Sequence, residues 1–400
     1  GATGRRLRGT QLGGGARSSS SATNGGGGGS ARHLAATTSE TKQNILIWEQ
    51  AEKEDYIVNT QDLIKLGEVV GKGDKVKDEE AVMASARFLR AHLPPKIAKR
   101  IKELQSLPFP FQKDGGSFQE ICGLYKESFL GVLASKVPTT LEEEAAFSEM
   151  IWQMKKNHLT VRQMVGEAMS NMRCTGSGEW VDQSGKLVYV DDADRESDFK
   201  VQNILRSFYN GRVGLRCLVE QHLMLRTGLL GQSFPGEEDD VCRVVWSRLR
   251  KAEKLSSMPP TILDTSCKLK TLVEISIADA KQALAEALEE RRQSIHVQIE
   301  GYVEEQRAVV PEHFCIVLYE ILSNAITATM EKHQPGALPP VIVTIGNSDG
   351  VAIKISDQGG GIFGDYESKV WKFTWSQRSP GVSATRQGLA LSRVYAQLWG

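Results

Sequence analysis

The sequence predicts a two-part α + α/β protein, in which a helical, bundle-like first half precedes a mixed α/β second half. In the first half, apolar residues recur every three or four positions, as amphipathic helices require. Beyond Pro260 the pattern changes, because β-branched runs at 341–345 and 351–355 now alternate with helical stretches and glycine-rich segments. Helices in one half and mixed elements in the other favour two separate cores.

Composition limits the protein class. The 400 residues are 40% hydrophobic and 24% charged, which excludes a fibrous or wholly disordered chain. Lysine plus arginine (49) equals aspartate plus glutamate (49), so no global field attracts nucleic acid, and we expect no nucleic-acid partner. No uninterrupted apolar run reaches the roughly 18 residues of a membrane helix, so we expect no membrane insertion. The six cysteines form no Cys-x-x-Cys pair, which disfavours structural zinc and suits a reducing compartment.

Residues 1–39 have the composition of a mitochondrial or plastid transit peptide. They contain five arginines, a serine run and a glycine run, and the first carboxylate of the chain is Glu40. Positive, serine-rich and acid-free segments are typical of organelle targeting. The alternative is a flexible Gly/Ser linker with incidental arginines. On either interpretation we expect no fold in this segment.

Helical periodicity then dominates up to about residue 226. We expect a helix over Asp78–Leu93 that ends at Pro94-Pro95, a short helix up to Leu107, and a further helix over 118–134. Thr140-Leu-Glu-Glu143 matches a capping box, and a methionine stripe after it predicts one long core helix to about Arg173. A last helix is expected over 199–226.

An insertion at 174–198 interrupts these helices. Trp180-Val181 and residues 187–190 flank a Gln-Ser-Gly turn, which predicts a small hairpin, and an acidic tract follows that we interpret as solvated surface. The domain division expected from these patterns is 1–39 as a disordered leader, 40–228 as a helical bundle, 229–260 as a linker with a helix, and 261–400 as the α/β domain.

Candidate chemistry begins on a helix expected over Pro311–Glu331. Glu320, Asn324, Thr327 and Glu331 fall at i, i+4, i+7 and i+11, on one face of that helix. A carboxylate and a carboxamide one turn apart can hold a proton acceptor and an Mg²⁺ ligand in a fixed relation. Taken alone, such spacing usually marks only a solvated helix face.

Two glycine-rich segments strengthen this interpretation. Strands 341–345 and 351–355 form an expected hairpin, and the second leads into Asp357-Gln-Gly-Gly-Gly361. A carboxylate at a strand end can accept a hydrogen bond from the exocyclic amine of adenine, and glycines let the backbone approach a base or a phosphate. Gly388-Leu389 opens a further helix, whose N-terminal amides could meet phosphate oxygens.

This order of motifs resembles the ATP-binding fold shared by histidine kinases, gyrase-type topoisomerases, Hsp90 and MutL. Within that group the chain is similar to the mitochondrial α-ketoacid dehydrogenase kinases, on segments that span most of residues 80–400. They include Arg212-Val-Gly-Leu-Arg216 and Ala328-Thr-Met-Glu331. The second of these, with Arg100-Ile-Lys102 and Val343-Thr-Ile345, leans toward the branched-chain kinase over the pyruvate kinases.

The resemblance implies a four-helix-bundle-like domain followed by an α/β-sandwich ATPase domain of the histidine-kinase/Hsp90 type. It implies a kinase that uses ATP and Mg²⁺ to phosphorylate a serine of the decarboxylase component and switch the complex off. Its helical domain would dock the lipoyl-bearing core, and the protein would be a homodimer in the mitochondrial matrix. The implied site comprises Glu320 as the base, Asn324 as the Mg²⁺ ligand, and Asp357, Gly359, Gly361, Thr374, Gly388 and Leu389 around the nucleotide.

The chain departs from the family at several of these positions. Ser323 and Thr327 stand where the family has lysine and arginine, and Gln358 stands where it has arginine. Ala384 and Arg386 replace two glycines of the last motif. Lost charge compensation beside a triphosphate motivates a second hypothesis, a catalytically weak pseudokinase that regulates the complex. A third is a two-component histidine kinase with His222 as phosphoacceptor, although Leu223 and Met224 follow where an acidic residue is usual.

Overall fold

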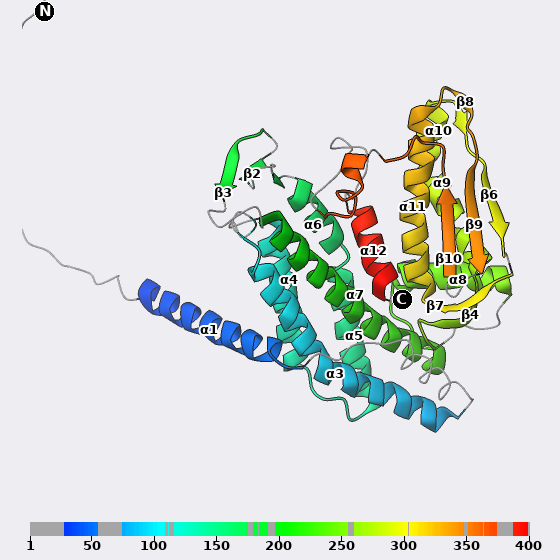
Figure 1. Ribbon diagram of the computed structural model, residues 1–400. Helices are drawn as coiled ribbons and strands as arrows, with labels where there is room; N and C mark the ends of the chain where they lie inside the picture. The colour runs from blue at the N-terminus through cyan, green and yellow to red at the C-terminus, as the bar shows by residue number, and fades with distance from the viewer. Residues whose placement is uncertain are drawn as a thin grey trace, which may run out of the picture. The chain divides into compact units, whose positions relative to one another are not determined.

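The computed structural model describes thirteen stretches of the chain (Figure 1). They are residues 28–54, 74–108, 111, 116–170, 172–174, 179–182, 184–190, 197–254, 260–302, 304–347, 351–362, 364–373 and 387–398. Two compact units are distinguished, Gly1–Leu46 and Ile47–Gly400. Helix α1 (Gly28–Ala51) begins at Gly28, inside the segment for which the sequence predicts no fold. All contacts described below lie within the second unit.

Among the described residues, five helices make up most of the first half of that unit, in cyan to green in Figure 1. They are α3 (Lys75–Gln105), α4 (Ser117–Ala134), α5 (Leu141–Asn157), α6 (Val161–Ser170) and α7 (Ser197–Leu230). Helix α3 packs against α4, α5 and α7, and α6 packs against α4. Their buried apolar faces meet in a core that includes Leu93, Ile97, Tyr125, Ile151 and Phe208.

Two predicted helix boundaries in this half are wrong. Helix α3 does not end at Pro94-Pro95 but continues through both prolines to Gln105. A proline inside a helix costs about 3 kcal/mol, because it removes an N–H donor and crowds the preceding turn. Both prolines and Ile97 are buried, and each buried large apolar side chain contributes about 1.5–3 kcal/mol. Tertiary burial thus outweighs the local penalty.

The long helix predicted after Thr140 is also wrong in extent, since it divides into α5 and α6 around His158. Tertiary contacts hold this break. Arg212 of α7 donates a hydrogen bond to the His158 carbonyl at 2.6 Å, and the His158 ring nitrogen Nε2 lies 2.9 Å from the Ser128 hydroxyl. The capping box itself is confirmed, because Thr140 Oγ1 accepts from the Glu143 N–H at 3.2 Å. The Glu143 carboxylate reaches back to the Thr139 N–H at 2.9 Å.

The hairpin predicted in the insertion is confirmed as part of a three-stranded antiparallel sheet. Its strands are β1 (Met172–Cys174), β2 (Glu179–Asp182) and β3 (Leu187–Val190), in the order β1-β2-β3. Trp180 of β2 is buried, and its ring meets that of Phe111 edge to face at 5.0 Å. Most of the acidic tract, residues 191–196, lies outside the described residues.

The second half combines strands with helices, which confirms the expected change of pattern. In chain order its elements are η1 (Glu237–Asp239), α8 (Val241–Glu253), β4 (Asp264–Lys268), α9 (Leu269–Ala283), α10 (Ala285–Glu290), β5 (Gln293–Ser294), β6 (Val297–Gly301), β7 (Gln306–Val309), α11 (Pro311–Lys332), β8 (Gly336–Ala337), β9 (Val341–Asn347), β10 (Val351–Ser356), η2 (Gly364–Tyr366) and α12 (Gly388–Leu398). The single helix expected over 269–291 is interrupted at Leu284, and the strand expected at 295–299 begins at Val297.

A sheet with the order β10-β9-β6 organises this half. Strands β9 and β10 are the predicted antiparallel hairpin, whereas β6 and β9 are parallel and are linked through β7, α11 and β8. Val341, Val343 and Ile345 alternate along β9 onto the buried face, where α11 and α9 cover them. Figure 1 shows α11 lying along this sheet. The described chain is therefore an α+β protein with small sheets.

Helix α11 serves as the core helix of the sheet. Among the described residues it alone is long and apolar enough to cross a membrane by length and composition, a property shared with core helices. Leu318, Leu322 and Ile326 on its inner side belong to one hydrophobic cluster with Val273 of α9 and with β9. Because this packing fixes α11 on the sheet, it also fixes the opposite face that carries the candidate site.

Candidate functional site

Glu320 lies on α11 at a point where three helices meet. Its carboxylate is 14% exposed, and Oε1 accepts a hydrogen bond from Arg162 Nη2 of α6. The other oxygen, Oε2, faces Gly388 at the start of α12 so closely that a Cβ on that residue would overlap it. A side chain at position 388 would therefore require the Glu320 carboxylate to move. The fold brings two residues that are 68 positions apart, both expected in the site, into direct contact.

Asn324, one turn further along α11, is half-buried and makes no side-chain hydrogen bond to any residue that the structure describes. The neighbouring Ser323 hydroxyl is buried and likewise has no partner among the described residues. Polar groups placed this way usually have a partner, since an unsatisfied buried group costs about 1–3 kcal/mol. Thr327 differs, because its Oγ1 donates to the Ser323 carbonyl at 2.6 Å. Asn324 and Ser323 are thus free to bind a ligand, and Thr327 is not.

The Asp357–Gly361 segment follows β10 and folds against the C-terminal half of α11. Asp357 Oδ1 accepts from the Gly359 N–H at 2.7 Å. A Cβ on Gly359 would overlap Ala328 of α11, so only glycine fits there. Gly361 has φ of 78°, a left-handed conformation that favours glycine. The Asp-x-Gly-Gly-Gly motif therefore packs against the same helix, α11, that carries the Glu-x-x-x-Asn face.

Helix α7 contacts the residues on both sides of segment 374–386. Before that segment, the Phe373 N–H donates to Gln202 Oε1 at 2.8 Å, and the Phe373 ring stacks on Tyr209 at 5.2 Å. After it, Tyr209 Oη donates to Gln387 Oε1 at 2.5 Å. Leu389 is half-buried two residues further on, and Thr374 lies outside the described residues. No local motif in the sequence marks Gln202 or Tyr209, so only the fold places them beside this segment.

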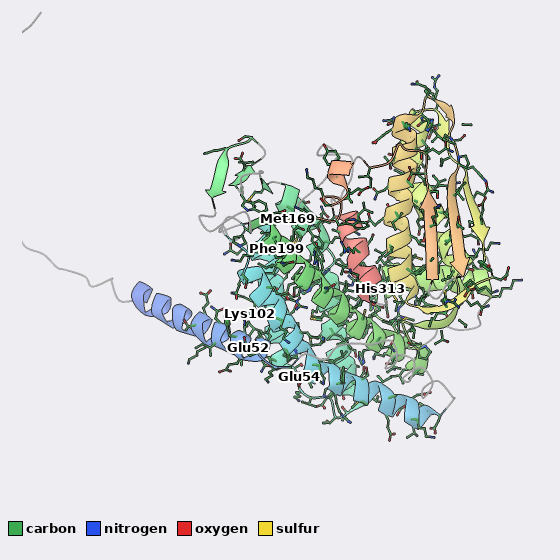
Figure 2. The ribbon with its side chains drawn as sticks, in the orientation of Figure 1. Glu52, Glu54, Lys102, Met169, Phe199 and His313 are labelled. Atoms are coloured by element: carbon green, nitrogen blue, oxygen red, sulfur yellow. The ribbon has the colours of Figure 1, made fainter. Side chains whose placement is uncertain are left out.

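A cavity of about 350 Å³ adjoins Glu320, between α6, α7, α8, α11 and α12. Charged side chains line it from several elements: Arg162, Arg212, Arg216, Asp279, Glu312 and Glu320. His313 lies beside it, where the first turn of α11 meets α12 (Figure 2), and its ring is 4.7 Å from that of Tyr395. Burial and the nearby Arg216 charge lower the pKa of His313 to about 3, so its imidazole is neutral at physiological pH.

His222, the alternative phosphoacceptor, is fully buried in α7. Its Nε2 lies 2.7 Å from the Ser148 hydroxyl and 3.4 Å from the Glu144 carboxylate, and its Nδ1 lies 3.0 Å from the Ser85 hydroxyl. The ring is thus enclosed by partners inside the helical half. Among the described residues, no group of three or more His, Cys, Asp or Glu side chains could hold a metal ion.

The chain is similar in sequence to several known proteins. A family model described as mitochondrial branched-chain alpha-ketoacid dehydrogenase kinase matches residues 59–240, most of the helical half. Over most of its length the chain is thus similar to mitochondrial α-ketoacid dehydrogenase kinases. It is 22% identical over 342 residues to a mitochondrial pyruvate dehydrogenase (acetyl-transferring) kinase of Arabidopsis thaliana, which covers 80% of each chain. It is 25% identical over 325 residues to isozyme 1 of that kinase from Homo sapiens, covering 78% of this chain and 67% of the relative.

The Drosophila melanogaster relative, also named a mitochondrial pyruvate dehydrogenase (acetyl-transferring) kinase, is 25% identical over 332 residues and extends the match to 78% of this chain and 70% of that one. A match of this extent includes both halves of the chain. All three relatives are named as dehydrogenase kinases, which agrees with the resemblance seen in the sequence. The family model and these relatives name different dehydrogenases, so the complex that this kinase recognises is a separate question.

Proposed function

We propose that the chain is an ATP-dependent protein-serine kinase that phosphorylates and inactivates the decarboxylase component of a mitochondrial α-ketoacid dehydrogenase complex. The observation that carries this proposal is the contact between Glu320 and Gly388, with the unpartnered Asn324 one turn away. A carboxylate, an Mg²⁺-type ligand and a glycine at a helix N-terminus are the parts that phosphoryl transfer requires in one place.

The described residues fit a bound nucleotide. A Cβ on Gly361 would meet open space, and the Asn324 carboxamide has no competing partner among the described residues. Bound Mg·ATP supplies the transferable γ-phosphoryl group and the neutralising metal charge. Asn324 would hold the metal ion, and Asp357, which still has acceptor capacity, would bind the adenine amine. Backbone at Gly359, Gly361, Gly388 and Leu389, together with Thr374, would line the nucleotide. Glu320 would take the serine proton.

We further propose the domain roles and the partners. Residues 40–228 would dock the lipoyl-bearing core and regulate activity, and residues 261–400 would form the α/β-sandwich ATPase domain. The protein would work as a homodimer. The relatives are named mitochondrial, which supports the mitochondrion, and within it we propose the matrix. Of the two complexes we place the branched-chain complex first, because the family model of the helical half carries that name, and the pyruvate complex next.

The test offers γ-labelled Mg·ATP and each dehydrogenase complex to the purified chain and to the variant Glu320→Gln. We expect acid-stable label on a serine of one decarboxylase, and a loss of about 100–10,000-fold in transfer by the variant, the contribution of general-base catalysis. Nucleotide binding should persist in the variant. Glu274→Gln, an exposed substitution on α9, is the matched control. Equal transfer by Glu320→Gln and the control would reject Glu320 as the base.

A second candidate, the regulatory pseudokinase, is favoured by one observation. The Thr327 hydroxyl is engaged with its own helix, and Ser323 carries no charge, so α11 offers no cation beside Asn324. The same experiment separates the two functions. Nucleotide binding without label on either complex would support the pseudokinase, whereas label on a histidine of the chain itself would indicate a histidine kinase.

A further inference from the structure

We propose that Arg162 of α6 is a positioning residue for Glu320, which holds and neutralises the carboxylate beside the N-terminus of α12. The proposal rests on the proposed function, because it gives Glu320 its role as base. None of the motifs in the sequence includes Arg162, which stands in an otherwise ordinary amphipathic stretch. Its partner is 158 residues away, so only the folded chain reveals the pair.

Tertiary contacts fix the position of Arg162. Arg162 is the second residue of α6, directly after the break at His158. Arg212 holds that break through the His158 carbonyl, at 2.6 Å, and the buried Val161 and Val165 anchor α6 in the helical core. The guanidinium, 29% exposed, is thereby delivered to Glu320 from a fixed direction. A rigid support of this kind is what a catalytic carboxylate requires.

The ion pair sets which carboxylate oxygen is available. Arg162 occupies Oε1, and Oε2 points at Gly388, where we expect phosphate oxygens near the first amides of α12. A glutamate side chain has several rotamers, and a bond to one oxygen selects among them. Arg162 therefore directs Oε2 toward the place where a serine hydroxyl would meet the terminal phosphate.

Charge gives Arg162 a second effect. A carboxylate that is 14% exposed and stands beside a triphosphate repels it, unless a cation compensates. The two other arginines of the adjoining cavity are already engaged. Arg212 donates to the Tyr125 hydroxyl and the His158 carbonyl, and Arg216 pairs with Glu312 at 3.5 Å. Of the three arginines that line the cavity, Arg162 is the one bonded to Glu320. Removing it would leave the negative charge of Glu320 uncompensated.

The experiment uses the full chain with Arg162→Ala, Arg162→Lys and the matched control Gln163→Ala, which truncates the exposed neighbour on α6. Against the control, we expect Arg162→Ala to lower kcat by about 10–100-fold, the scale of a misplaced catalytic group. Arg162→Lys should restore most of kcat, and added guanidinium ion at non-denaturing concentration should partly rescue Arg162→Ala. A merely structural tie between α6 and α11 would show no such rescue.

A binding measurement makes the proposal independent of turnover. Arg162→Ala should weaken the Kd for Mg·ATP about tenfold, by leaving one uncompensated charge near the phosphates. The double variant Arg162→Ala, Glu320→Gln should bind as tightly as Glu320→Gln alone, because the repelling charge is gone. Weakened binding in both backgrounds would overturn the proposal, as would Arg162→Ala turnover at or above that of the control. Absent phosphoryl transfer by the wild-type chain would instead count against the proposed function, and the binding cycle would still decide the role of Arg162.

Discussion

Helices α7 and α11 both carry polar side chains, but those that the two helices hold differ in whether they have partners within the protein. On α7 these side chains are buried and bonded to protein: Glu220 pairs with Lys155, Gln221 accepts from the Ile262 N–H at 3.0 Å, and His222 lies between two serines. On α11, Ser323 and Asn324 have no side-chain partner among the described residues. Polar groups paired inside the protein support the fold, whereas the unpaired groups of α11 are those that we propose bind a ligand.

The largest effect on stability should come from breaking the buried ion pairs that α7 makes with its neighbours. Lys155 is 4% exposed and pairs with Glu220 and, at 2.8 Å, with Asp240. Burial opposes its charge, yet both carboxylates raise the pKa of Lys155. Lys155→Met would leave two buried carboxylates without their cation, and we expect it to lower the free energy of unfolding by about 3–5 kcal/mol.

Urea unfolding at pH 7 measures this change. Lys156→Met, at the half-buried next position, is the control and should cost less than about 1 kcal/mol. Equal losses for both variants would mean that the ion network on α7 does not support the fold.

Replacing the unpaired Asn324 of α11 should have the reverse effect, a loss of activity with little change in stability. Asn324→Ala should lower phosphoryl transfer at least about 100-fold, because it removes the expected metal ligand. It should change the free energy of unfolding by less than about 0.5 kcal/mol, since no hydrogen bond to the described residues is lost. Kinase assays at varied Mg²⁺ concentration, with unfolding curves alongside, measure both quantities.

Asn210→Ala, at an exposed position of α7, is the matched control and should leave both quantities unchanged. A variant at Asn324 that is destabilised but still active would place this asparagine with the scaffold rather than with the site.

The smallest effect concerns two buried histidines that contact α7. Burial and Arg212 lower the pKa of His158 to about 4, and burial and Arg216 lower that of His313 to about 3. Both values lie below the usual 6.5, so the unfolded chain binds protons that the folded chain does not. Stability is therefore complete above about pH 6.5 and falls as the pH drops below it, by about 1 kcal/mol per histidine between pH 7 and 5.5.

Unfolding curves at those two pH values test the sign. Between pH 7 and 5.5, the free energy of unfolding of His158→Gln should fall by about 1 kcal/mol less than that of the wild-type chain. An unchanged pH dependence in this variant would show that His158 is not held neutral.

Local patterns were sufficient where neighbours along the chain decide the outcome. The capping box at Thr140, the β9–β10 hairpin and the shared face of Glu320 and Asn324 follow from spacing of a few residues, and the fold has all of them. Local patterns failed at Pro94-Pro95 and at His158. At the prolines, burial in the core stabilises the helix by more than the local penalty costs. At His158, a hydrogen bond from Arg212 stabilises a helix break that apolar periodicity cannot predict.

The sequence by itself determined the residue types of the candidate site, their order along the chain, and the resemblance to a kinase family, because motif chemistry and helical spacing are local properties. Only the tertiary structure decided which of these residues meet. It placed Gly388 against Glu320, Gly359 against Ala328, and Arg162 on the proposed base. Such contacts join residues far apart along the chain, and they form only because packing of α6, α11 and α12 brings those residues together.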